Sequence, residues 1–253
     1  MPRARSLIIA SDDGLIVERD PDRPSGRLLR QDDMQASYVD LADLRHLEFD
    51  YLRWARLVLR GFGARRVLHV GGGACTLARA LLSEDGGSRQ EVIEVDARVF
   101  DLAREHLGLR RQPGLRLRVG DGREVVAARA DASADAIVVD AFAGARVPHH
   151  LGTSEAFAEF ARVAPLTVVN VVDTAGWRDA RAIAAGLGDP YRHVAALSSA
   201  ARRGGNVVVF GSRTRPRYAH LEAVAAADRY PARLQREPGL GAGAWRDHDA
   251  VPA

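Results

Sequence analysis

From Arg65 onward, the sequence alternates strand-like runs with helix-like segments, and this alternation constrains the fold more than any other feature. The strand-length runs are mostly continuous and apolar: RVLHV, EVIEV, LRLRV, AIVVD and LTVVNVV. The segments between them have the apolar spacing of helices: residues 76–83, 97–107, 122–130 and 153–162. Strands that alternate with helices form a parallel sheet covered on both faces. The chain is therefore predicted to be an α/β protein with a Rossmann-like core.

Two further runs, YRHVAALSS and NVVVFGSR, close this region. They are separated only by Ala-Ala-Arg-Arg-Gly-Gly, which is too short for a crossover, so this pair is predicted to be antiparallel. Five parallel strands that end in an antiparallel hairpin resemble the layout of class I S-adenosylmethionine-dependent transferases. The expected fold is accordingly a class I methyltransferase-like sheet of seven strands.

The N-terminal region has a different character. Its short runs SLIIA, GLIVER, GRLLRQ and ASYVDL are separated by turn residues, which predicts a small antiparallel β-domain. A helical pattern follows at residues 46–59. The expected organisation is a β-hairpin region at 1–45, a Rossmann-like nucleoside-binding transferase core at 46–213, and a C-terminal helix and tail at 214–253.

The composition excludes several kinds of chemistry. All 36 basic residues are Arg, so neither a Lys Schiff base nor a P-loop Lys is available. The net charge is only +3 and the Arg clusters lack interleaved aromatic residues, so no nucleic-acid partner is expected. Cys75 is the single cysteine, which excludes an intramolecular disulfide and fits a reducing compartment. No apolar run reaches the ~18 residues of a membrane span, so a cytoplasmic protein without membrane contact is expected.

Glycines and acidic residues follow the predicted parallel strands at one edge of the sheet. Gly71–Gly73 follow the first strand, where glycines let the backbone approach a ligand at a helix N-terminus. Position 76 is Thr rather than the third Gly of a dinucleotide fingerprint, which disfavours NAD. Glu94 ends the second strand, 23 residues after Gly71, where an acid can accept both ribose hydroxyl protons. Asp121 and Asp140 end the third and fourth strands, and the set predicts a nucleoside site.

These motifs resemble those of the spermidine synthases, a family of aminopropyltransferases, over about residues 30–211. VLHVGGGAC is similar to the family's first motif, and Glu94-Val95-Asp96 is similar to its ribose-binding Glu-Ile-Asp. Gly120-Asp121-Gly122 resembles its adenine-side motif, and Asp140 opens a stretch similar to its gate loop. The predicted N-terminal hairpins also match this family and separate it from generic methyltransferases.

The resemblance implies a transferase whose cosubstrate is S-adenosylmethionine or its decarboxylated form, bound without a metal. Tyr51 would line the acceptor pocket, and Asp140 would be the catalytic residue nearest the transferred group. The family further implies a small-molecule acceptor and a homodimer. The residues implied in cosubstrate binding are Gln35, Gly71, Gly72, Gly73, Glu94, Asp96, Asp121 and Gly122.

Two departures from the family pattern affect the expected activity. Ala74 and Ala143 stand where the family has carboxylates that face a cationic substrate. Because binding a polyamine without carboxylates is costly, an efficient polyamine synthase is not expected. A small-molecule methyltransferase and a non-catalytic nucleoside-binding paralogue are the alternatives. Ala74 further predicts a preference for S-adenosylmethionine, whose carboxylate would face backbone N–H groups of the Gly71–Cys75 turn.

Four residues with reactive side chains are expected to have mostly structural roles. His69 lies inside an apolar strand and is predicted to be a hydrogen-bonded core histidine. Cys75 is predicted to serve packing rather than catalysis. His149 and His150 are adjacent on the gate-like loop, which is a poor metal pair without further ligands, although either ring can act as a base.

Overall fold

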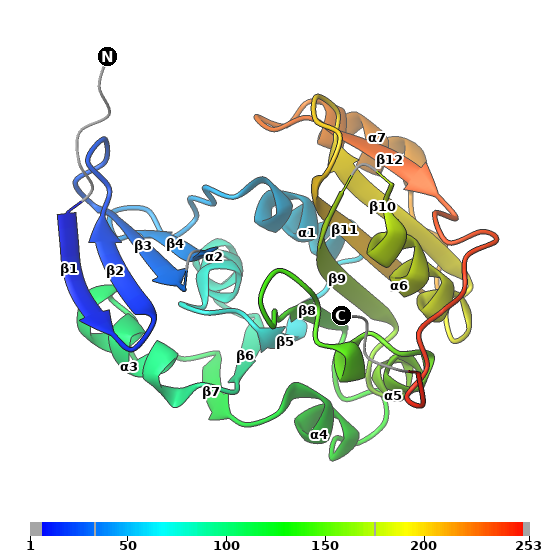
Figure 1. The fold of residues 1–253 in the computed structure, drawn as a ribbon, viewed down its shortest axis with the longest axis horizontal. Helices are drawn as coiled ribbons and strands as arrows, with labels where there is room; N and C mark the ends of the chain where they lie inside the picture. Colours follow the sequence, from blue (N-terminus) through cyan, green and yellow to red (C-terminus); the bar gives the residue numbers. More distant parts are fainter. Residues whose placement is uncertain (1–6, 33, 175, 250–253) are drawn as a thin grey trace.

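The computed structural model describes residues 7–32, 34–174 and 176–249, and its N-terminal part is a separate small sheet. This sheet is an antiparallel meander in the order β1-β2-β3-β4, which confirms the expected hairpins (Figure 1). Buried side chains of the meander, including Leu15 and Leu29, pack with Val99 and Phe100 of the core. The strands are β1 (Leu7–Asp12), β2 (Leu15–Arg19), β3 (Gly26–Gln31) and β4 (Met34–Asp40).

The main sheet has the order β12-β10-β11-β9-β8-β5-β6-β7. Neighbours from β9 to β7 run parallel, whereas β11, β10 and β12 are antiparallel to their neighbours. The α/β fold class and the closing hairpin are therefore confirmed. The strands are β5 (Arg66–Gly71), β6 (Arg89–Glu94), β7 (Leu115–Val119), β8 (Ala136–Asp140), β9 (Leu166–Asp173), β10 (His193–Ser199), β11 (Gly205–Ser212) and β12 (Ala232–Arg236).

The sheet has one strand more than the seven that the sequence predicted. The additional strand, β12, lies in the C-terminal tail and pairs antiparallel with β10, where Leu234 lies opposite Leu197. ARLQR is too short and too rich in Arg to predict a strand on its own. Pairing with β10 supplies the hydrogen bonds that stabilise it at the edge of the sheet.

Helices cover both faces of the main sheet. Trp54, Leu77 and Leu221 come from α1, α2 and α7 and share one cluster of buried apolar side chains with the sheet. None of the described helices combines the length and apolar character that a membrane crossing requires. The helices are α1 (Asp50–Gly61), α2 (Thr76–Glu84), α3 (Ala97–His106), α4 (Gly122–Ala127), α5 (Ser154–Val163), α6 (Arg178–Gly188), α7 (Tyr218–Ala226) and the 3-10 turn η1 (His149–Leu151).

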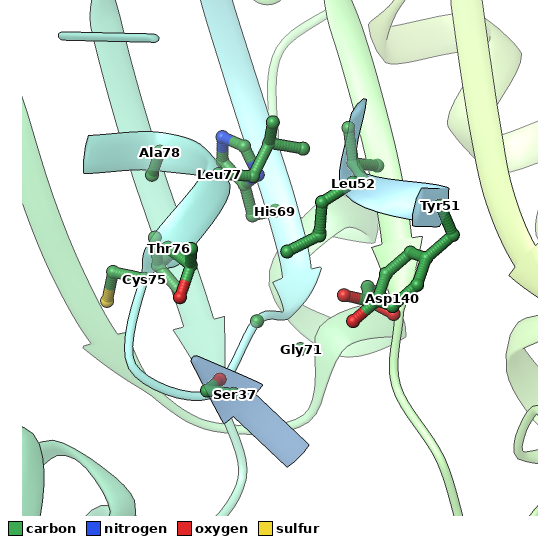
Figure 2. A pocket seen from close by; sticks show the side chains of 13 residues that line it. Ser37, Tyr51, Leu52, His69, Gly71, Cys75, Thr76, Leu77, Ala78 and Asp140 are labelled. Carbon is green, nitrogen blue, oxygen red and sulfur yellow. The ribbon is translucent and has the colours of Figure 1, made fainter. Parts of the chain in front are cut away.

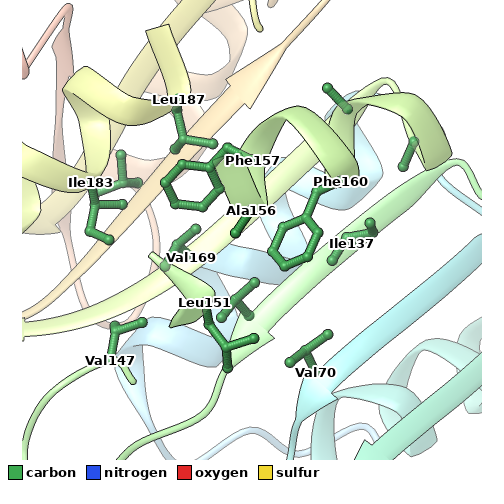
Figure 3. Close-up of a cluster of buried hydrophobic side chains, with 14 of the residues drawn as sticks. Val70, Ile137, Val147, Leu151, Ala156, Phe157, Phe160, Val169, Ile183 and Leu187 are labelled. Carbon is green, nitrogen blue, oxygen red and sulfur yellow. The ribbon is translucent and has the colours of Figure 1, made fainter. Parts of the chain in front are cut away.

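The second large cluster lies under α4, α5 and α6. Phe157 and Phe160 of α5 are fully buried and meet edge to face, with ring centroids 6.1 Å apart (Figure 3). Leu151 of η1 belongs to the same cluster. Full burial of such side chains contributes about 1.5–3 kcal/mol each to folding. This packing fixes the loop between β8 and α5, which forms one wall of the candidate site.

Candidate functional site

A cavity of about 550 Å3 lies where β5, β6, β7 and β8 end, which is the edge at which open α/β sheets bind ligands. The structure brings every site residue predicted from the sequence to its wall. These residues are Gln35, Tyr51, Gly71, Gly72, Gly73, Glu94, Asp96, Asp121, Gly122 and Asp140. A pocket of about 20 Å3, large enough for one water, lies beside it and shares Tyr51 and Asp140 (Figure 2).

The glycine loop, Gly71–Gly73 after β5, has a backbone conformation and close contacts that only glycine accommodates well. Gly71, Gly72 and Gly73 have φ of 73°, 138° and 50°, which L residues rarely adopt. A Cβ on Gly71 would lie 2.5 Å from the carbonyl oxygen of Asp140, and one on Gly73 would lie 2.3 Å from Ser37 Oγ. The glycines therefore allow β8 and the N-terminal sheet to pack closely around the first turn of the cavity.

Ala74 lies behind the glycine loop and not on the cavity wall. Its side chain is fully buried in the cluster beneath the N-terminal sheet and does not line the cavity. Its N–H donates to Ser37 Oγ at 3.0 Å, and the N–H of Cys75 donates to the carbonyl of Gly72 at 2.8 Å. These two N–H groups cannot also hold a ligand carboxylate. The expected preference for S-adenosylmethionine therefore has no support from these two N–H groups.

Glu94, at the end of β6, is a largely buried carboxylate on the cavity wall. Burial raises its pKa above the ordinary value, while hydrogen bonds from the backbone N–H groups of Asp96, Val95 and Gly73 act in the opposite direction. The N–H of Asp96 lies 3.2 Å from Oε1. The carboxylate is thus held by the glycine loop and by the turn after β6. A carboxylate has about four acceptor positions, so Glu94 can still accept a hydrogen bond from a ligand hydroxyl.

Asp96 lines the cavity, but its carboxylate is engaged locally. It caps α3, accepting from the N–H of Arg98 at 3.0 Å, and it forms an ion pair with the Arg98 side chain at 2.7 Å. These hydrogen bonds lower the pKa of Asp96. A helix cap is worth about 1 kcal/mol. These contacts indicate that Asp96, although it lines the cavity, mainly stabilises the start of α3.

Asp121 has two distinct hydrogen-bonding sides. One oxygen caps α4, accepting from the N–H groups of Arg123 at 2.9 Å and Glu124 at 3.1 Å. The other oxygen lies 2.8 Å from Nε2 of His150, which also lines the cavity. The sequence did not predict this pairing, because the two residues are far apart along the chain. The contact between Asp121 and His150 connects the turn after β7 with the loop after β8.

Asp140, at the end of β8, forms the most unusual electrostatic group of the site. Burial raises its pKa to about 6, while hydrogen bonds from Asn170 and Tyr51 lower it. Nδ2 of Asn170 donates to Oδ1 of Asp140 at 2.9 Å. Figure 2 shows the Tyr51 ring against this carboxylate. A carboxylate with a pKa near neutral is suited to accept a proton.

Asn170 is a site residue that sequence reasoning missed. It is 4% exposed, lines the cavity, and its Oδ1 has no hydrogen-bond partner among the described residues. A buried acceptor without a partner is costly, and a donor from a ligand would satisfy it. The available signal was the one amide side chain inside the largely apolar run LTVVNVV, on the strand next to β8.

The other reactive side chains considered from the sequence, His69, Cys75 and His149, do not line this cavity. His69 is buried and hydrogen-bonded to Gln90 at 2.8 Å, and burial lowers its pKa to about 4, as expected for a neutral core histidine. Burial raises the pKa of Cys75 to about 12, which leaves the thiol unreactive. His149 stacks on Trp245 instead of facing the cavity. Among residues 7–32, 34–174 and 176–249, no group of three potential metal ligands comes together.

The sequence matches no protein-family model. Among solved structures, it is similar to a probable spermidine synthase from Corynebacterium glutamicum ATCC 13032, with 29% identity and a TM-score of 0.85 over 100% of this chain and 99% of that one. A spermidine synthase solved in complex with the transition-state analogue AdoDATO has 20% identity and a TM-score of 0.64, over 82% of this chain and 74% of that one. Human methyltransferase-like protein 13 in complex with SAH has 16% identity and a TM-score of 0.56, over 79% of this chain and 96% of that one.

The first likeness confirms the resemblance to the spermidine synthase-like family, because it extends over both chains in full. The other two show a shared fold. The chain has the fold that these spermidine synthases share with the methyltransferase.

Proposed function

We propose that this protein is a spermidine synthase-like transferase that uses S-adenosylmethionine or its decarboxylated form. It transfers an alkyl group from the sulfonium of that cosubstrate to a small amine. The observation that carries the proposal is the buried group of Asp140, Tyr51 and Asn170, which shares one cavity with the ribose-type carboxylate Glu94. A buried carboxylate with a raised pKa in a cleft is typical of catalytic sites, which favours a transferase over a non-catalytic nucleoside-binding protein.

The proposed nucleoside end consists of the glycine loop and the turns after β6 and β7. Glu94 accepts the ribose hydroxyl protons, and the turn of Asp121 and Gly122 lies at the adenine. Gln35 contributes from β4. Two structures with this fold are complexes with AdoDATO and SAH, which supports an adenosyl ligand here.

The proposed reaction is an in-line displacement at the carbon bonded to the sulfonium. The acceptor ammonium gives a proton to the Asp140 carboxylate, and the freed lone pair attacks the carbon. A C–N bond forms, the C–S bond breaks, and the sulfur keeps its electron pair as a neutral thioether. Such a step depends mainly on alignment, and the positioned base contributes roughly 10²–10⁴-fold. Tyr51 and Asn170 hold Asp140 in place, because both donate hydrogen bonds to its carboxylate.

The acceptor proposed for this site carries a single cationic group. The cavity wall that comes from α1, β8, β9 and the loops beside them has Asp140 as the one carboxylate among its described residues. The unpartnered Oδ1 of Asn170 would accept a second N–H of the same amine. The other wall residues here include Phe49, Phe142 and Val172, which favour an apolar substituent on the amine.

Product analysis with labelled cosubstrates tests the proposal. Protein is incubated with a panel of primary monoamines and either methyl-labelled S-adenosylmethionine or aminopropyl-labelled decarboxylated S-adenosylmethionine. Label in an amine product is the expected result, and the productive cosubstrate identifies the group transferred. Methyl transfer alone would favour the methyltransferase alternative. Binding of both compounds without any labelled product would favour the non-catalytic alternative.

Putrescine is expected to be a poor acceptor. A diamine brings a second charge, and a cationic group in a partly dry cavity without a carboxylate partner is destabilised. We expect aminopropyl transfer to putrescine far below one turnover per second, the low end for typical enzymes. The measurement is spermidine formation by chromatography, with the best monoamine of the panel as the control. Turnover near one per second would show that another group binds the second ammonium.

A further inference from the structure

The C-terminal strap, residues 238–249, packs on the outer side of the loop that carries His150. The Trp245 ring stacks on His149, with centroids 5.7 Å apart and planes at 24°. The carbonyl of Trp245 accepts from the N–H of Ser154 at 3.0 Å. A Cβ on Gly152 would lie 2.9 Å from the Trp245 ring, so the two segments are in close contact. In Figure 1 the red C-terminal segment runs down to α5, where this loop ends.

Asp247 of the strap joins three parts of the chain. Its carboxylate accepts from Nη1 and Nη2 of Arg123 at 2.7 and 2.8 Å, and from Oγ1 of Thr153 at 2.6 Å. The same guanidinium donates to the Glu159 carboxylate at 2.9 Å and to the carbonyl of His150 at 3.2 Å. The strap, α4 and the loop before α5 are therefore held by one network of charge-assisted hydrogen bonds.

Arg123 connects this network with two residues of the cavity wall, Asp121 and His150. Arg123 follows Asp121 by two residues at the start of α4, and both belong to the same capped turn. His150, whose carbonyl Arg123 holds, bonds back to the Asp121 carboxylate at 2.8 Å. Asp121 and His150 both line the cavity, whereas Asp247 and Arg123 do not. A change at Asp247 can therefore alter the adenine end of the cavity without touching the ligand.

We infer that Asp247 is a positioning residue, which holds Asp121 and His150 in the arrangement that binds the adenosyl ligand. The inference rests on the proposed function for the identity of that ligand. Without Asp247, Arg123 keeps Glu159 but loses its bidentate partner, and Thr153 loses the acceptor of its hydroxyl. The loop that carries His150 then has fewer contacts to hold it against α4.

The Asp247 carboxylate is ionised over the pH range of the proposed binding experiments. Hydrogen bonds from Arg123 are the largest cause that lowers its pKa, to about 2. Other titratable side chains nearby are Glu159, which shares the Arg123 guanidinium, Glu155, whose Oε2 accepts from the N–H of Asp247 at 3.2 Å, and His149. Asp247 stays ionised between pH 5 and 8 on this basis, so a neutral Asn is an informative replacement.

The test is the affinity of Asp247→Asn for methylthioadenosine, measured by titration calorimetry at 25 °C. We expect binding about three- to tenfold weaker, the usual scale for a change outside direct ligand contact. Asp249→Asn is the matched control, because Asp249 lies on the same strap and its carboxylate contacts, among the described residues, only other strap residues: it accepts from the N–H of Arg246 at 2.7 Å and lies 3.9 Å from Nε2 of His248. Asp247→Glu, which keeps the charge, is expected to recover most of the affinity.

Hydrogen exchange of residues 146–153 in the unliganded protein is measured in parallel. Faster exchange there in Asp247→Asn, but not in Asp249→Asn, is the expected result. Unchanged affinity in Asp247→Asn, or a melting temperature that falls while affinity stays constant, would reduce Asp247 to a stabilising contact and overturn the inference. If wild-type protein bound no methylthioadenosine, the proposed function would fail instead. Hydrogen exchange of residues 146–153 would still show whether Asp247 holds the loop. Unchanged exchange in Asp247→Asn would refute that role.

Discussion

Asp140→Asn is expected to lower the rate of alkyl transfer by roughly 10²–10⁴-fold, the usual contribution of a positioned general base. The amide keeps the shape of the side chain and a hydrogen bond with Asn170 or Tyr51, but it cannot take a proton from the acceptor amine. Methylthioadenosine affinity should stay within about twofold, because the nucleoside end is untouched. Label transfer to the best monoamine measures the first effect, and calorimetry measures the second.

The pH dependence distinguishes a base at Asp140 from a merely structural carboxylate. Because the pKa of Asp140 is raised to about 6, wild-type activity should fall as pH drops through this value and the base becomes protonated. The Tyr51 hydroxyl lowers the pKa of Asp140, so Tyr51→Phe should move this decline to higher pH. A decline that stayed in place in Tyr51→Phe, or full activity in Asp140→Asn, would remove Asp140 from the role of base.

The same raised pKa has a consequence for stability. The folded protein binds a proton on Asp140 more tightly than the unfolded chain does, so ionised Asp140 destabilises the fold above pH 6. This cost disappears as pH falls towards the unfolded pKa near 4. Asp140→Asn should therefore raise the free energy of unfolding at pH 8 by about 1–3 kcal/mol, and the gain should vanish below about pH 4. Denaturant unfolding at both pH values, with wild type alongside, measures it.

The sequence predicted the elements that follow local rules. Continuous apolar runs between helical patterns identified β5, β6, β8 and β9, since such runs are typical of buried parallel strands. The edge strand β7, whose LRLRV alternates Leu with Arg and has no buried residue, was identified by its length and by its place between two helical patterns. The six residues between the predicted runs YRHVAALSS and NVVVFGSR were too few for a crossover, which fixed the direction of β10 and β11. Because the carboxyl ends of parallel strands meet at one edge, the positions of Gly71, Glu94 and Asp140 along the chain also placed them around one cavity.

Features that depend on tertiary contacts were not predictable in this way. The strand β12 forms because β10 offers it an edge, and its own composition does not indicate a strand. Ala74 was assigned to the cavity by motif alone, whereas the N-terminal sheet covers it completely. The pairing of Asp121 with His150, and the contact of Asp247 with Arg123, join residues that only the folded chain brings together.

Glu94→Ala is expected to weaken methylthioadenosine binding by about 1.5–3 kcal/mol, the usual contribution of hydrogen bonds to a charged group. This corresponds to roughly 10- to 150-fold in the dissociation constant. The carboxylate is held by backbone N–H groups on both sides, so it meets the ribose hydroxyls without a cost of reorganisation. Titration calorimetry measures the effect, with Glu124→Ala, an exposed acid near the site, as the control.

Comparison with Asp96→Ala separates ligand binding from local structure. The Asp96 carboxylate caps α3 and pairs with Arg98, so its replacement should lower the melting temperature and change affinity by less than about fivefold. The raised pKa of Glu94 adds a second criterion. Wild-type affinity should decline in mildly acidic solution, because protonation removes the charge that accepts both hydroxyls, whereas Glu94→Ala should show no such decline. If the two variants lost affinity equally, the ribose would be bound by the turn after β6 as a whole, and not by Glu94 in particular.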